Sequence, residues 1–335
     1  MKINYPNIEI LVIDDGSFDL TSEIAKKFED KGKLRVIYKE NGGKADALNR
    51  GIDEALGEYI LCMDADSILN EDVLLECMGY FQKYPDLSAV AGRVEIGNSQ
   101  NILSKFQKLE YITGLNLFKR GQSFLKTVTI IPGPIGVFRR EELLEVGKYD
   151  LDTFAEDADL TIRLIIAGHR IKYNHRMVAV TEGPIEISQL VTQRYRWSRG
   201  MVQAIFKNIS HLNIFKSGLR NSLTILYMLV ESVFIPIINF SFTMLTVQYA
   251  LTYGGTQMLG SYFLGLTLLD LSLTLFSMIT ERNIKPFFML AILNRVTYGL
   301  FLETLRFFAI IDELLGIPMS WGQLKRTGLK SEGES

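Results

Sequence analysis

The sequence predicts an α/β domain with a mostly parallel sheet, followed by C-terminal transmembrane helices. Two observations support this prediction. Short apolar runs alternate with helical patterns in the first 220 residues, and strands that alternate with helices form parallel βαβ units. Beyond residue 220 only 15 residues are charged, and Ser232–Leu269 contains no charge at all.

The predicted elements follow one another in a regular order. Five segments rich in β-branched or aromatic residues are predicted as strands: Ile8–Ile13, Leu34–Tyr38, Tyr59–Met63, Ala89–Ile96 and Arg170–Tyr173. Five segments with helical spacing are predicted as helices: Thr21–Asp30, Lys44–Ala55, Glu71–Tyr84, Asn101–Gly121 and Glu156–Ala167. Asp19 and Thr21 are candidate N-caps of the first helix.

Two apolar segments near the C-terminus are long enough to cross the hydrocarbon core of a membrane. They are Leu223–Leu251 and Leu259–Thr280. Phe287–Ile311 is a third candidate, but it carries three charges, which are costly inside a bilayer. The alternative for this segment is an interfacial helix, because Arg295 and Arg306 share one helical face.

The positive charges predict the orientation in a cytoplasmic membrane. The N-terminus has no apolar signal segment, and Lys207, Lys216 and Arg220 precede the first span. We therefore expect a cytoplasmic domain over residues 1–220, a multi-pass membrane region with two or three helices over 221–311, and a polar tail over 312–335. Arg282 and Lys285 would lie on the cytoplasmic side. An even number of crossings would also keep the basic tail residues Lys325, Arg326 and Lys330 on that side.

The composition excludes several classes of protein. Of the 335 residues, 47% are hydrophobic, which excludes a disordered chain. Cys62 and Cys77 are the only cysteines, so the chain is not a disulfide scaffold. The net charge of −2 offers no electrostatic basis for a nucleic-acid partner.

Acidic residues follow two predicted strands. Asp14 and Asp15 end the first strand, at the edge of a sheet where α/β proteins bind ligands; the alternative is an Asp-Gly turn. Asp64 and Asp66 follow Tyr59–Met63 and can lie on one side of an extended chain. Two such carboxylates suit a hard divalent cation, and the alternative is a polar loop.

Two further clusters could bind substrate or move a proton. Glu156 and Asp157 open a predicted helix, where they would be a general base or N-terminal capping acids. Gln193–Trp197 combines two arginines with two aromatic residues. Guanidinium groups bind diphosphates and an indole stacks on sugar, whereas the alternative is a basic juxtamembrane helix.

Five ordered motifs resemble those of one known family, the family 2 glycosyltransferases of the processive, membrane-integrated kind. This group includes hyaluronan, chitin, cellulose and poly-N-acetylglucosamine synthases. The matching residues are Asp14–Ser17 (D-D-G-S), Gly43–Asn49 (G-K-x-x-A-L-N), Asp64–Asp66 (D-x-D), Glu156-Asp157 (the acids of T-E-D) and Gln193–Trp197 (Q-x-x-R-W). Trp321–Gly328 resembles the family's W-G-x-x-x-R-T-G tail.

The resemblance implies a GT-A-like fold and inverting transfer from a UDP-sugar, with N-acetylglucosamine as the expected sugar. It places Asp14, Asp15 and Lys44 at the nucleotide-sugar, and Asp64 and Asp66 on Mg²⁺ or Mn²⁺. It makes Asp157 the base that takes the proton of the acceptor hydroxyl. Residues of the diphosphate and acceptor sites would be Glu156, Gln193, Arg196 and Trp197.

The resemblance also implies partners and reveals departures from the family pattern. The acceptor would be a growing polysaccharide or a lipid-linked sugar in contact with membrane lipid, and export subunits are possible partners. The family's first strand and its upstream membrane helix are not found, and Ala155 replaces a frequent threonine. Two alternatives remain open: non-processive transfer of one sugar to a lipid carrier or glycolipid, and an inactive, truncated assembly partner.

Overall fold

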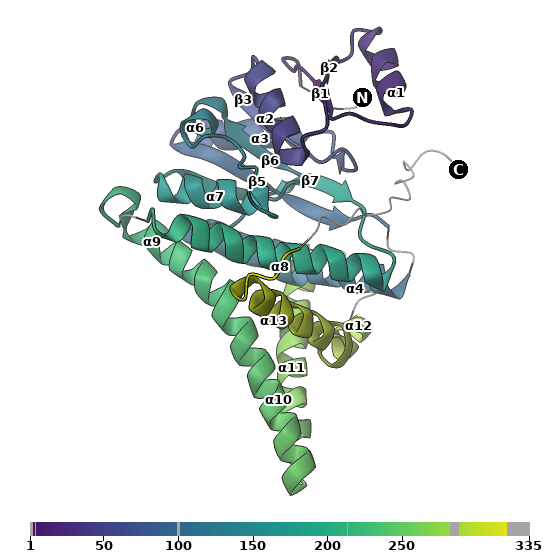
Figure 1. Ribbon diagram of the computed structural model, residues 1–335, viewed down its shortest axis with the longest axis vertical. Helices are drawn as coiled ribbons and strands as arrows, with labels where there is room; N and C mark the ends of the chain where they lie inside the picture. Colours follow the sequence, from purple (N-terminus) through teal and green to yellow (C-terminus); the bar gives the residue numbers. More distant parts are fainter. Residues whose placement is uncertain (1–2, 4, 99–100, 213, 282–287, 320–335) are drawn as a thin grey trace.

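A computed structural model describes residues 3, 5–98, 101–212, 214–281 and 288–319 (Figure 1). Its first unit is β1 (Leu11–Asp14), α1 (Thr21–Glu29) and β2 (Arg35–Tyr38), with the two strands parallel. Asp19 Oδ1 accepts a hydrogen bond from Thr21 N at 3.0 Å, which satisfies one amide at the start of α1. The βαβ prediction for this part is confirmed.

The main sheet is mixed, so the prediction of a mostly parallel sheet is wrong. Its strands run in the order β3-β6-β5-β7-β4. Their bounds are Tyr59–Cys62 for β3, Ile68–Leu69 for β4, Leu87–Ile96 for β5, Gly136–Arg139 for β6 and Arg170–Thr181 for β7. Only β5 and β7 pair in parallel; β6 lies antiparallel between β3 and β5, and β4 is antiparallel to β7. The short strand β6, which the sequence pattern did not reveal, runs opposite to both of its neighbours, β3 and β5.

The helices of the first part agree with the sequence prediction, apart from two that it missed. They are α2 (Lys44–Glu54), α3 (Val73–Lys83), α4 (Ile102–Glu110), α5 (Leu117–Leu125), α6 (Arg140–Glu145), α7 (Glu156–Ile166) and α8 (Ile187–Ile209). Asn101 caps α4 in a reciprocal pair with Ser104. The segment predicted as one helix over 101–121 is α4 and α5 joined by a π-helical segment, η1 (Tyr111–Asn116). The predicted elements missed α6 and α8.

Two buried clusters cover the opposite faces of the main sheet. Ala89 and Phe138 pack with Ile162 of α7 on one face, whereas Val90 and Val137 pack with α3 on the other. This division follows from the strand period, because successive side chains point to opposite faces. Helix α8 adds Ala204 and Ile205 to the cluster that contains α7, so both helices lie on one side of the sheet.

Two long helical segments leave the domain side by side (Figure 1). The first joins α9 (Ile214–Leu229), η2 (Val230–Phe234) and α10 (Ile235–Tyr253), and the second is α11 (Thr256–Glu281). Within them, 217–253 and 256–277 are long and apolar enough to cross a membrane, and most of their side chains are exposed. Exposed apolar surface of this extent is atypical of a soluble core helix. The helical prediction for both spans is confirmed.

The third candidate span is helical but packs against the first domain. It consists of α12 (Phe288–Asn294), η4 (Arg295–Gly299) and α13 (Leu300–Leu314), and α13 crosses below α8 in Figure 1. Tyr195 donates a hydrogen bond to Asp312, and Arg199 Nε lies 2.7 Å from Glu313 Oε2. These contacts favour the interfacial alternative. Arg282, Lys285, Lys325, Arg326, Lys330 and the motif Trp321–Gly328 lie outside the described residues.

Candidate active site

A cavity of about 370 Å³ lies between the end of β3, the start of α7, and the helices α5 and α8. Eight of the ten predicted site residues line it: Lys44, Asp64, Asp66, Glu156, Asp157, Gln193, Arg196 and Trp197. These residues come from positions far apart in the sequence, and the fold brings them to one place. The cavity is the candidate active site.

Lys44 links two of the acidic motifs. It is the first residue of α2, and its Nζ lies 2.6 Å from Asp64 Oδ1 and 2.9 Å from Glu156 Oε1. Burial acts to raise the pKa of Glu156, but the charge and hydrogen bond of Lys44, a backbone hydrogen bond and the charge of Arg196 together hold that pKa below its usual value. The cavity thus contains one cation that is shared between two carboxylates.

Asp157 has the properties of a general base. Its two carboxylate oxygens accept hydrogen bonds from Gly133 N at 3.2 Å and from Ala158 N at 2.9 Å. Burial and the neighbouring charge of Glu156 raise the pKa of Asp157 to about 6. A carboxyl group with a pKa close to neutrality can accept a proton efficiently at physiological pH.

Asp64 and Asp66 line the cavity together, as the D-x-D pattern predicts. In the part of the chain that the structure describes, no group of three or more His, Cys, Asp and Glu side chains stands ready to hold a metal ion. Mg²⁺ commonly binds to one or two carboxylates and completes its shell with water and substrate phosphates. Two carboxylates facing a cavity of this size fit such an ion.

Asp14 and Asp15 lie outside the lining of this cavity. Asp14 accepts hydrogen bonds from Ser17 N at 2.9 Å and from the Ser22 hydroxyl. Asp15 accepts from Gly42 N at 2.9 Å and Gly43 N at 2.8 Å. These hydrogen bonds hold a turn, so the geometry around Asp14 matches the alternative that Asp14 belongs to an Asp-Gly turn. Asp15 fixes the loop immediately before Lys44 and so acts on the position of that lysine.

Helix α8 brings the arginines and the tryptophan to the cavity. The Arg194 guanidinium lies 4.3 Å from the centre of the Trp197 ring and 2.8 Å from Glu110 Oε2. Tyr298 donates to the same Glu110 oxygen at 2.6 Å. Arg194 therefore packs against the indole, and Arg194, Arg196 and Trp197 all line the cavity. Glu110 and Tyr298 were missed because nothing in the sequence pairs residues 188 positions apart.

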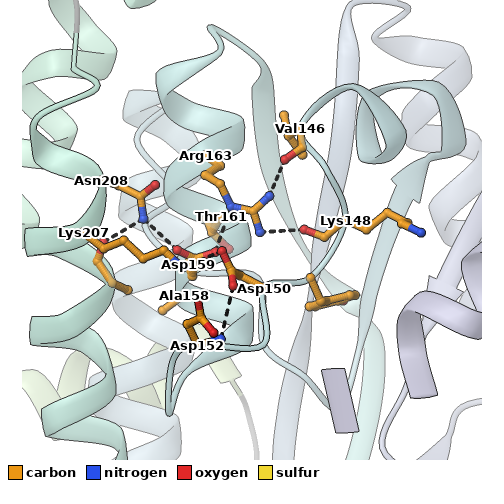
Figure 2. Close-up of polar contacts among 12 residues, drawn as sticks. Val146, Lys148, Asp150, Asp152, Ala158, Asp159, Thr161, Arg163, Lys207 and Asn208 are labelled. Carbon is orange, nitrogen blue, oxygen red and sulfur yellow. Dashed lines mark hydrogen bonds and ion pairs between the residues drawn. The ribbon is translucent and has the colours of Figure 1, made fainter. Parts of the chain in front are cut away.

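A second polar network lies behind the acidic pair and fixes α7 in place (Figure 2). Asp159 is fully buried; its Oδ2 lies 2.8 Å from Arg163 Nε, and its Oδ1 accepts from Asn208 Nδ2 at 2.7 Å. Arg163 also donates to the carbonyl oxygens of Val146 and Lys148. The network joins α7 to α8 and to the loop that contains Val146 and Lys148, which precedes α7. It therefore fixes the position of α7 relative to α8, the two helices that line the site.

Close packing at Gly200 also sets the separation of these helices. A Cβ atom at this position of α8 would lie 2.7 Å from both the Cβ and the backbone N of Ala155. Only glycine allows this approach without a shift of the backbone. Ala155 precedes the acidic pair, so the missing side chain at Gly200 brings α8 close to Glu156 and Asp157.

The fold and the site define a glycosyltransferase domain. Residues 1–147 match the family described as Glycosyl transferase family 2. The mannosyltransferase PcManGT from Pyrobaculum calidifontis, solved with GDP-Man and Mn²⁺, superposes with a TM-score of 0.60 at 18% identity, covering 95% of this chain and 81% of that one. Residues 1–147 thus match the family that the motifs predict, and the domain has a GT-A-like fold.

The similar sequences are polysaccharide synthases. Over 256 residues the chain is 33% identical to a poly-β-1,6-N-acetyl-D-glucosamine synthase of Staphylococcus epidermidis, covering 74% of this chain and 61% of that protein. The synthase of Staphylococcus aureus strain COL is 34% identical over 209 residues, or 62% of this chain and 51% of the relative. The chain therefore spans between half and two thirds of the length of these relatives.

Proposed function

We propose that the protein transfers N-acetylglucosamine from UDP-N-acetylglucosamine to a growing polysaccharide at the cytoplasmic face of a membrane, with inversion at the anomeric carbon. One observation carries the proposal: a single cavity contains a carboxyl base with a near-neutral pKa, the D-x-D acids, and the arginine and tryptophan of α8. The names of the similar synthases support the choice of sugar and product.

In the proposed reaction, Asp157 takes the proton of an acceptor hydroxyl. The oxygen attacks the anomeric carbon, the bond from that carbon to the diphosphate oxygen breaks, and the electron pair leaves with UDP. A single displacement needs the attacking and leaving oxygens on opposite faces of the sugar, as in inverting glycosidases. Asp157 therefore faces the acceptor, and the diphosphate lies on the other side of the donor sugar.

The other residues hold the donor. Lys44, released from Asp64 and Glu156 when the diphosphate enters, pairs with its oxygens together with Arg196. Asp64 and Asp66 would hold Mg²⁺ or Mn²⁺, which offsets the charge on the leaving diphosphate. Gln193 and Trp197 contact the acceptor sugar. Asp14 holds the turn that carries Asp15, and Asp15 contributes to the nucleotide site by shaping the loop that ends at Lys44.

The division of the chain supports a membrane location. We propose a cytoplasmic catalytic domain over residues 1–220, a membrane region over 221–311 and a polar tail over 312–335. The exposed apolar helices 217–253 and 256–277 fit two crossings, which return the chain to the side of the catalytic domain. Lipid would then cover the apolar surface that the protein leaves open.

A panel of radiolabelled UDP-sugars tests the proposal. Membranes containing the full chain are supplied with Mg²⁺ or Mn²⁺ and each sugar nucleotide, and product length is measured. We expect incorporation of N-acetylglucosamine into long chains. Transfer of one sugar to a lipid would overturn processive synthesis in favour of a lipid-directed transferase.

UDP binding by variants tests whether the site is active at all. We expect Asp66→Ala to weaken metal-dependent UDP binding, and Asp14→Ala to weaken it through the loop, whereas the exposed Asp30→Ala leaves it unchanged. Absence of measurable UDP affinity in the original protein would instead support the role of an inactive assembly partner.

A further inference from the structure

Lys119 on α5 differs from the other buried cations of the protein. Its side chain is 5% exposed and lines the candidate active site beside Asp157. In the described part of the chain, no hydrogen bond or ion pair joins the Lys119 ammonium to another residue. Arg194 and Arg199 are equally buried, and each has a carboxylate partner within 2.8 Å.

An ammonium group without a partner in a protein interior is unfavourable. Burial lowers the pKa of Lys119 to about 8, and the charge of Asp157 only partly opposes this effect. Neighbouring polar groups are already used: Asn116 donates to Val94 O at 3.0 Å and accepts from the Tyr173 hydroxyl. A molecule that enters the cavity can therefore supply the hydrogen-bond acceptor that the described residues do not give to Lys119.

The position of Lys119 indicates which molecule this is. Lys44 contacts Asp64 and Glu156, at the part of the cavity assigned to the diphosphate. Lys119, in contrast, interacts electrostatically with Asp157. The same cavity is also lined by two uncharged polar side chains that lie 3.3 Å apart: Gln122, three residues after Lys119 in α5, and Thr129. An ammonium among uncharged polar groups donates to hydroxyl or amide carbonyl oxygens.

We propose that Lys119 binds an oxygen of the acceptor sugar, a hydroxyl or an amide carbonyl next to the hydroxyl that Asp157 deprotonates. This inference rests on the proposed function. The lysine holds the sugar at a second point, which orients the attacking hydroxyl toward the base. Lys119 is thus a specificity residue for the acceptor, with no direct part in holding the donor.

Separate Michaelis constants for donor and acceptor test the proposal. The substrates are UDP-N-acetylglucosamine and a β-1,6-linked N-acetylglucosamine oligosaccharide, with the full chain in membranes. We expect Lys119→Met to raise the acceptor KM at least tenfold while the donor KM changes less than twofold. Lys119→Arg should restore most of the acceptor affinity, and Lys105→Met on the exposed face of α4 is the matched control.

The pH dependence separates binding from a structural role. Lys119 is charged below pH 8 and loses its proton above it, so the original protein should lose acceptor affinity as the pH rises through about 8. Lys119→Arg, whose charge persists, should not show this loss. An acceptor KM that Lys119→Met leaves unchanged, or an alkaline loss that persists in Lys119→Arg, would overturn the proposal.

Two measurements keep this inference distinct from the proposed function. The melting temperature of Lys119→Met should not fall, because methionine fills the space without an unpaired charge. If the original protein transfers no sugar, the proposed function fails. Direct binding of the oligosaccharide to the solubilised full chain then still decides the role of Lys119: equal affinity in the original protein and Lys119→Met rejects it.

Discussion

Two charged residues of the cavity, Asp157 and Lys119, and the charged residues between α11 and α13 are arranged in opposite ways. Arg295 lies 2.7 Å and 3.0 Å from the two carboxylate oxygens of Asp270 and 2.9 Å from Glu303. Every charge in that cluster has a partner within the protein. In the cavity, Asp157 and Lys119 face open space and have only backbone donors or no partner. Closed pairing away from the cavity indicates a structural role. Unpaired charge beside the cavity indicates chemistry, and the paired Lys44, Asp64 and Glu156 share that position.

The largest expected effect is on the cavity side of this comparison. Asp157→Asn removes the proton acceptor but keeps the shape of the side chain, so transfer should fall by about 10²–10⁴-fold. UDP binding and melting temperature should remain close to those of the original protein, because among the described residues no hydrogen bond or ion pair joins Asp157 to Lys44 or to the D-x-D acids. Incorporation of radiolabelled sugar measures the loss, and transfer near the original rate would contradict the assignment.

The opposite behaviour is expected for Arg295, Asp270 and Glu303, which we call the closed cluster. Arg295→Met leaves Asp270 and Glu303 without their cation and should lower the free energy of unfolding by about 3–5 kcal/mol. Transfer per folded molecule should not change. Unfolding in detergent measures the effect, and adding Asp270→Asn and Glu303→Gln to the same chain should recover much of the stability. Loss of transfer without loss of stability would mean that this cluster also has a catalytic role.

The smallest expected effect is the pH dependence of kcat/KM, which separates the cavity from the closed cluster a third time. Asp157 must be deprotonated to act as a base, and its pKa is about 6. The value of kcat/KM should therefore fall about tenfold for each pH unit below 6 and reach a plateau above it, which ends where Lys119 loses its proton near pH 8. A profile that stays flat down to pH 5 would exclude Asp157 as the group that limits the reaction. The closed cluster should not contribute to this profile.

The sequence was sufficient to predict most of the site because its residues follow local rules. Acids at strand ends and in the first turn of a helix can be located without a structure, and Asp64 and Glu156 lie where these rules place them. Asp14 follows the same rule but serves a turn. Whether such an acid faces a cavity depends on the neighbouring loop, which residue patterns alone do not specify.

The parts that could not be predicted depend on long-range contacts. Strand β6 has four residues and no clear alternation, so only its pairing with β3 and β5 identifies it. The same holds for the third apolar segment: its charges are satisfied by Asp270 and Glu110, which come from separate helices. Lys119 carries no motif signal, because what distinguishes it is the absence of a partner in three dimensions.

The contact at Gly200 offers a means of redesigning the acceptor site. Exchanging Trp197 would reshape one wall of the cavity, but the distance between α7 and α8 would still be set where Gly200 meets Ala155. Gly200→Ala would force the two backbones apart near the acidic pair. An engineer who wants the enzyme to accept a bulkier sugar could therefore widen the opening with one methyl group, outside the residues that perform the chemistry.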